Sequence, residues 1–112
     1  ASYPCEDMDT NLLMIKTLLD RFGPPVGYSS HDVGVGPSII AVVLGATSIE
    51  KHITLDRAMY GSDQAASLER KGLEYLVKEC RGVVVCMGDG RKSIKEIEAG
   101  VAKKLRYWED NG

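Results

Sequence analysis

An alternation of helical and extended segments constrains the fold of this chain more than any other feature. Apolar residues recur with helical spacing over residues 10–22, and Gly23-Pro24-Pro25 ends that run. A glycine-rich turn separates the next extended segment from the next helix, and Pro37 suits the first position of that helix. The pattern predicts a helix over 10–22, a strand over 26–29, a helix over about 37–44 and a strand over 47–55.

The second predicted strand has two distinct faces, and two further helices follow it. Its residues alternate, with one face carrying Ile49, Lys51 and Ile53 and the other carrying Glu50, His52 and Thr54. Ser67 is a candidate N-cap for a helix that a period near 3.6 extends to about Met87, although "GVVVCMG" also resembles a strand. A capping box of Ser93 and Glu96 predicts a last helix over 93–108.

Strands that alternate with helices in this way form parallel βαβ units. In a parallel sheet or barrel, the loops that follow the strands converge at the carboxyl edge, and ligands bind there. Three such loops are predicted, "YPCEDMD", "SSHDVGVG" and "DRAMYGSDQ", the first of which would follow a strand lying before Ala1. Polar chemistry is therefore expected at this edge.

Composition excludes several classes of function. A chain of 112 residues forms at most one domain, and its 44% hydrophobic content is that of a globular protein. A net charge of -2 leaves no basic face for nucleic acid, and the basic run 103–106 is expected on a solvated helix face. No apolar stretch approaches the ~20 residues of a membrane span, and no signal peptide is visible. Three cysteines without CxxC spacing indicate free thiols and a cytoplasmic protein, with Cys80 expected in the core.

The chain has only two histidines, and both lie at or near the ends of predicted strands. His31 follows the segment 26–29, and His52 lies within 47–55. Imidazoles at the ends of adjacent parallel strands can share one metal ion, with other coordination positions left for water and substrate oxygen. Two unrelated histidines, each with one structural hydrogen bond, would give the same pattern, and position alone does not separate these alternatives.

Other polar residues in the same loops also have two interpretations. Ser29 and Ser30 lie beside the amides of a glycine-rich turn and could seat an oxyanion or a phosphate, or could serve ordinary turn chemistry. Asp32, Asp56 and Asp63 could support a metal ligand, act as a general base or accept a sugar hydroxyl. They could equally be loop or capping carboxylates.

The sequence resembles the sialic acid synthase family over nearly its whole length. The similarity begins at Tyr3-Pro4 and continues in order to "KKLRYW", and its most specific motifs are "GYSxH", "EKHxTLD" and "GSDxxASLE". The resemblance implies an α/β fold, namely the C-terminal part of a (β/α)8 TIM barrel. It also implies one partial domain over 1–112, without the antifreeze-like domain that often follows that barrel.

Members of that family condense phosphoenolpyruvate with N-acetylmannosamine or its 6-phosphate, which gives a nonulosonic acid and phosphate. By this resemblance, His31 and His52 would be the protein ligands of a catalytic divalent metal, usually manganese or magnesium, although imidazole favours softer first-row metals. Ser29 would hydrogen-bond the phosphate of phosphoenolpyruvate. Asp63 and Tyr3 would contact the open-chain N-acyl hexosamine, which makes His31, His52 and Asp63 the implied catalytic residues.

In the implied reaction, the metal polarises the aldehyde oxygen of the sugar, and the enol carbon of phosphoenolpyruvate attacks the aldehyde carbon. Water then adds to the cationic centre, and phosphate leaves with C–O cleavage, so no covalent enzyme intermediate is needed. Two positions depart from the motif, which often has aspartate or glycine where Ser30 stands and histidine where Gln64 stands. These departures leave the metal ligands intact and affect the details of the sugar site.

The resemblance also covers only the last part of the barrel. A TIM barrel needs about 250 residues, and the lysines and acidic groups that relatives place on earlier strands are absent from this chain. We therefore expect the chain alone to be inactive and the enzyme to be a homo-oligomer, most simply a dimer. The alternative is a non-catalytic, self-associating barrel fragment or interaction module, because open sheet edges and uncovered apolar faces favour association.

Overall fold

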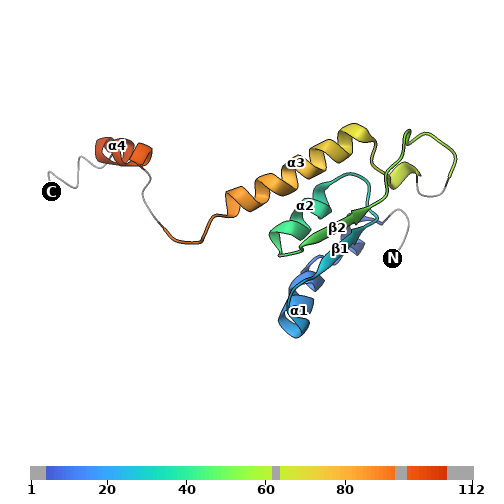
Figure 1. Ribbon diagram of the computed structural model, residues 1–112, viewed down its shortest axis with the longest axis horizontal. Coiled ribbons are helices and arrows are strands. Elements are labelled where there is room, and N and C mark those ends of the chain that lie inside the picture. Colours follow the sequence, from blue (N-terminus) through green and yellow to red (C-terminus); the bar gives the residue numbers. More distant parts are fainter. Residues whose placement is uncertain (1–4, 62–63, 93–95, 106–112) are drawn as a thin grey trace.

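The computed structural model describes residues 5–61, 64–92 and 96–105. The alternation of strands and helices predicted from the sequence is confirmed, so the protein belongs to the α/β class (Figure 1). Its elements are α1 (Leu13–Phe22), β1 (Gly27–Ser30), α2 (Gly36–Val43), β2 (Ser48–Lys51), α3 (Arg70–Met87) and α4 (Glu96–Leu105), with short 3-10 helices at Asp7–Asp9 and Gln64–Ala66.

The two strands are parallel neighbours joined by α2. Their register runs from Gly27 opposite Ser48 to Ser30 opposite Lys51. Both strands run toward the right of Figure 1, and the chain that follows β2 lies on that side. The carboxyl ends of the strands therefore meet at one edge, as predicted.

The helices cover one face of this small sheet. Ile15 of α1, Ala41 of α2 and Ala46 form the buried core, and partly buried side chains pack around them, namely Leu12, Leu19, Val26, Tyr28, Leu44 and Ile49. Because Tyr28 and Ile49 point into this core, α1 and α2 lie on their side of the sheet, and α3 packs against α2 (Figure 1). Ser29 and Glu50 point to the opposite face and are exposed.

Glycines end the first two helices, as the sequence predicts. Gly23 has a φ of 74° and donates its N–H to the Leu19 carbonyl at 2.9 Å. Gly45, just after α2, has a φ of 106°. Both values lie in the region that glycine adopts without steric cost, so the chain can turn sharply from each helix toward a strand.

Three expectations about the middle of the chain are wrong. β2 ends at Lys51 rather than at Leu55, because the chain beyond it pairs with the segment before α3: Leu68 N–H donates to the His52 carbonyl at 2.8 Å. The same pairing prevents Ser67 from capping α3, whose N-cap is Glu69. Cys80 is half-buried at the edge of a groove rather than in the core.

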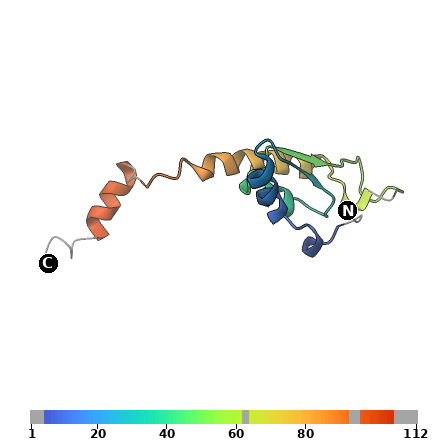
Figure 2. The same ribbon diagram turned by 90° about the horizontal axis from the view of Figure 1, so that it is seen from below.

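The period-3.6 pattern is confirmed for α3, which continues to Met87. α4 falls within the predicted helix 93–108, of which 93–95 and 106–108 lie outside the described residues. In both Figure 1 and Figure 2, α4 lies apart from the sheet, and the molecule measures 69 × 35 × 22 Å. Among the described residues, we find no helix that combines the length and apolarity needed to cross a membrane.

Candidate functional site

The two histidines lie side by side at the carboxyl edge of the sheet. The last paired residues of the strands are Ser30 and Lys51, so His31 and His52 are the next pair in the same register. Their ring centroids are 5.6 Å apart, and the rings are nearly perpendicular at 88°. The structure thus brings together the two residues that the sequence singled out.

Ser29 and Glu50 lie on the same face of the sheet as the histidines. They are register partners, and the Ser29 hydroxyl donates to Glu50 Oε1 at 2.8 Å. Ser29 Oγ is also 3.0 Å from His31 Nε2. This face therefore presents a hydroxyl, a carboxylate and two imidazoles on the side of the sheet that α1 and α2 leave uncovered.

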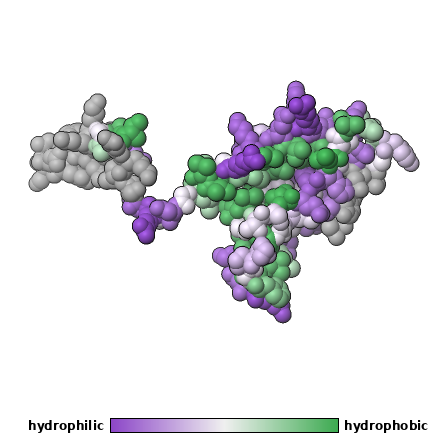
Figure 3. All heavy atoms as spheres, in the orientation of Figure 1, coloured by the Kyte–Doolittle hydropathy of each residue, from purple (hydrophilic) through white to green (hydrophobic). Residues whose placement is uncertain are grey.

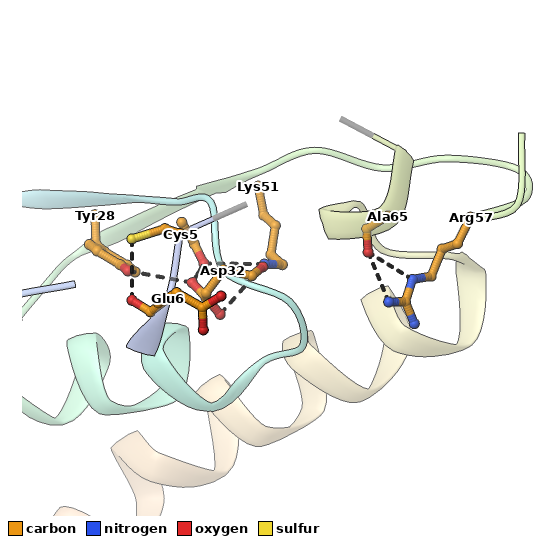
Figure 4. A network of polar contacts seen from close by, with 8 residues as sticks. Cys5, Glu6, Tyr28, Asp32, Lys51, Arg57 and Ala65 are labelled. Atoms are coloured by element: carbon orange, nitrogen blue, oxygen red, sulfur yellow. Dashed lines mark hydrogen bonds and ion pairs between the residues drawn. The ribbon is translucent and has the colours of Figure 1, made fainter. Parts of the chain in front are cut away.

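The alternate residues of the same segments form a buried polar cluster on the other face. Lys51 Nζ lies 2.5 Å from the Asp32 carbonyl oxygen, 3.2 Å from Ser30 Oγ and 3.8 Å from Asp32 Oδ2. The Ser30 hydroxyl donates to Asp32 Oδ1, and the Tyr28 hydroxyl donates to the same oxygen at 3.5 Å. Figure 4 shows Tyr28, Asp32 and Lys51 converging beside Cys5.

Burial in this cluster changes the acidity of two of its members. Removal from water lowers the pKa of Lys51, because desolvation disfavours its charged form, and the neighbouring Asp32 partly opposes that shift. Burial also raises the pKa of Tyr28, and the negative charge of Asp32 raises it further. Both directions describe a dry environment around Asp32.

This placement corrects two interpretations drawn from the sequence. Asp32 has an exposed fraction of 0% and Ser30 of 2%, so Asp32 cannot meet a sugar hydroxyl or act as a base there, and Ser30 cannot seat a phosphate. Asp56 has an ordinary loop role, since its carboxylate accepts the Ala58 N–H at 2.8 Å. Tyr3 and Asp63 lie outside the described residues.

The position that departs from the family motif after the second histidine has a structural role. Gln64 accepts a hydrogen bond from the Thr54 hydroxyl through its side-chain oxygen. The two backbones on either side are also joined, since Thr54 N–H donates to the Leu68 carbonyl at 2.8 Å. Gln64 therefore ties the loop after β2 to the segment that leads into α3.

The separation of the two imidazole rings is compatible with a shared metal ion. Two imidazoles on a tetrahedral ion, with metal–nitrogen bonds of about 2.1 Å, have ring centres roughly 5 Å apart, close to the observed 5.6 Å. Within the described part of the chain, no group of three or more His, Cys, Asp or Glu side chains is arranged to hold a metal. His31 and His52 therefore fit a site that water, substrate or other protein groups complete.

Two residues of this region received no role from the sequence. Glu50 shares the exposed face with the histidines, and Lys51 holds the buried cluster on the opposite face. The alternation within β2 already placed Glu50 on the face of His52, and that signal was sufficient to find it. Lys51 was not predictable, because its partner Asp32 comes from another segment.

Parallel strands with a histidine pair at their carboxyl ends define an α/β protein with a polar site at the edge of its sheet. Comparison with known proteins identifies the group to which it belongs: a model of the NeuB family matches residues 1–92. The chain belongs to the NeuB family.

Relatives and solved structures agree with this assignment. The chain is 36% identical over 106 residues to N,N'-diacetyllegionaminic acid synthase from Legionella pneumophila, which covers 95% of this chain and 30% of that protein. It is 40% identical over 106 residues to N-acetylneuraminate-9-phosphate synthase from Homo sapiens, which covers 94% of this chain and 30% of that protein.

The crystal structure of an N-acetylneuraminic acid (sialic acid) synthetase from Leptospira borgpetersenii, in complex with citrate, superposes with a TM-score of 0.79 at 36% identity. The match covers 96% of this chain and 36% of that one. The chain thus spans about a third of the length of the relatives that it matches.

Proposed function

We propose that this chain forms the carboxyl-terminal part of a (β/α)8 barrel that condenses phosphoenolpyruvate with N-acetylmannosamine or its 6-phosphate. In this proposal the chain supplies the metal-binding and phosphate-binding half of the active site. The observation that carries it is the pairing of His31 with His52 beside Ser29, on the uncovered face at the carboxyl edge of the strands. Ligands of parallel α/β proteins bind at this edge.

Each residue of the site has a defined task in this reaction. His31 and His52 would hold a divalent ion, manganese or magnesium, which when bound supplies Lewis-acid stabilisation of the sugar aldehyde oxygen. Ser29 would donate its hydroxyl to the phosphate of phosphoenolpyruvate, in place of the bond that it now makes to Glu50. Tyr3 and Asp63 would contact the open-chain sugar. None of these residues needs to form a covalent bond to the substrate.

Metal binding by the histidine pair is the first test of this proposal. The unsubstituted chain, titrated with Mn²⁺ and followed by electron paramagnetic resonance, should bind the ion weakly at one site. His31→Ala and His52→Ala should each weaken binding at least tenfold, because each removes one of two protein ligands. Glu74→Gln, an exposed change on α3, is the matched control and should leave binding unchanged. Unchanged Mn²⁺ binding in both histidine variants would refute the ligand assignment.

The second test is the reaction itself. The 112-residue chain should release no phosphate from phosphoenolpyruvate and N-acetylmannosamine, because it holds only part of the site. A complete family barrel that carries this chain as its carboxyl-terminal segment should release phosphate, and His31→Ala in that barrel should abolish release. Full activity of the His31→Ala barrel would contradict the proposal.

A second candidate function is that of a non-catalytic module that associates with itself. An apolar groove favours this alternative. The groove is lined by β2, α3 and the end of α2, and its lining residues include Val42, Ile49, Leu73, Val77 and Val84. Such a module would need no metal, so the Mn²⁺ titration separates it from the enzyme proposal.

A further inference from the structure

The paired register of β1 and β2 stops at Ser30 and Lys51, and both histidines come one residue later. Beyond that point each histidine backbone is hydrogen-bonded to a different segment: the Cys5 N–H donates to the His31 carbonyl, and the Leu68 N–H donates to the His52 carbonyl. A contact that joins the two strand ends to each other can therefore influence the separation of the rings, which is 5.6 Å.

A single buried side chain bridges the two strands at this point. Lys51, directly before His52, reaches across to the carbonyl oxygen of Asp32, directly after His31, at 2.5 Å. Its ammonium group is also 3.2 Å from Ser30 Oγ and 3.8 Å from Asp32 Oδ2 (Figure 4). The bridge thus spans from the residue before one histidine to the residue after the other.

The bridge lies in a nearly dry environment. The side chains of Lys51 and Asp32 are 3% and 0% exposed, so water does not screen their attraction. Ser30 fixes one carboxylate oxygen of Asp32, and the Cys5 N–H donates to the His31 carbonyl at 2.9 Å from the other side. A substitution that removes one partner would leave the other charge buried and unpaired, which is strongly unfavourable.

We infer that Ser30, Asp32 and Lys51, here called the Lys51–Asp32 clasp, are positioning residues that set the separation and orientation of His31 and His52. The clasp lies on the face of the sheet opposite to Ser29 and Glu50, so it acts through the backbone on either side of it. The inference rests on the proposed function for its purpose, because a fixed histidine pair matters only where both rings bind one ion.

The related motif often has aspartate or glycine at position 30, and the clasp shows how serine can replace the aspartate of that motif. Positions 30 and 32 are two residues apart in extended backbone, so their side chains lie on the same face. Both reach Lys51, and the Ser30 hydroxyl contacts the Asp32 carboxylate directly. A carboxylate at either position can therefore face the ammonium group.

The histidine count makes a direct test possible. With only two histidines in the chain, nuclear Overhauser effects between the His31 and His52 ring protons can be assigned without ambiguity. The unsubstituted chain should show this contact without any metal. Lys51→Met should reduce it at least threefold and should raise the Mn²⁺ dissociation constant about tenfold or more. Lys71→Met, an exposed change on α3, should alter neither measurement.

A second variant, in which the carboxylate of the clasp is moved rather than removed, separates loss of positioning from loss of folding. The double variant Ser30→Asp with Asp32→Ser keeps the charge of the clasp and moves the carboxylate by two residues, so it should retain both the ring contact and the Mn²⁺ affinity. A folded Lys51→Met variant with an unchanged ring contact would overturn the inference. So would a folded double variant that lost that contact. If the unsubstituted chain bound no Mn²⁺, the metal proposal would fail, and the ring contact would still decide the role of the clasp.

Discussion

Ser29 lies at the centre of the proton arrangement in the candidate site. A carboxylate only accepts hydrogen bonds, so the single Ser29 proton goes to Glu50 Oε1. The contact between Ser29 Oγ and His31 Nε2 then requires that Nε2 carry a proton. The Ser29 hydroxyl must therefore leave Glu50 Oε1 before it can donate to a phosphate, as the proposed function requires.

Glu50 should assist cation binding at the histidine pair. A unit charge roughly 6 Å from a divalent ion in water-like surroundings contributes about 1.4 kcal/mol, or about tenfold in affinity. Glu50→Gln keeps the shape of the side chain and removes that charge, so the Mn²⁺ dissociation constant should rise by about tenfold. Titration of both the variant and Glu74→Gln at low ionic strength checks this, and an equal or tighter affinity for Glu50→Gln would contradict it.

The in-and-out alternation of side chains continues past the last residue of each strand. The roles of single residues could be predicted from the sequence only where this continuation was taken into account. His31 and His52 were found because each follows an extended run. For Asp32 and Ser30 the sequence left a ligand contact and ordinary loop chemistry open, because "SSHD" was taken as a loop. The backbone stays extended through Asp32, which forms a bridge with Cys5, so every second residue turns to the buried face.

Among the elements, the end of α2 depends on one glycine. Gly45 has a φ of 106°, and a β-carbon there would lie 2.9 Å from Leu19 Cδ1 of α1. Gly45→Ala should therefore lower the free energy of unfolding by about 1 to 2 kcal/mol, chiefly because the backbone is strained, since the end of the flexible Leu19 side chain can shift.

Gly82 provides the matched control for that substitution. It lies inside α3 with open space around its β-position, so Gly82→Ala should raise the free energy of unfolding by roughly 0.5 to 1 kcal/mol. Urea denaturation followed by circular dichroism measures both. A neutral or stabilising effect of Gly45→Ala would show that the α2–β2 turn is not held as described.

The helices were more predictable than the ends of the strands. A helix is defined by contacts within its own segment, so the period of Leu73, Leu76 and Cys80 was enough to extend α3 through a β-branched run. β2 ends where it does because the chain after it pairs at Ile53 with Leu68, fifteen positions further along (68 − 53). No local pattern reports such a pairing, and for the same reason Ser67 was mistaken for a cap.

For the whole molecule, the exposed apolar surface is large for the size of its core. Figure 3 shows hydrophobic residues gathered over the side that α2, β2 and α3 form, where the apolar groove lies. The radius of gyration is 19.9 Å, whereas a compact domain of this length has about 13 Å. Surface of this kind marks a place where another protein segment packs.

A second copy of this chain should occupy the groove when no other part of a barrel covers it. Sedimentation equilibrium should then show association that increases with concentration. Val84 lines the groove, and Val84→Asp should raise the dimer dissociation constant at least tenfold, because a carboxylate replaces a buried methyl pair in each copy. Val85→Asp is the matched control: Val85 is 82% exposed but is not among the groove residues, so association should change little. A monomer at all concentrations, or equal effects of the two substitutions, would contradict this arrangement.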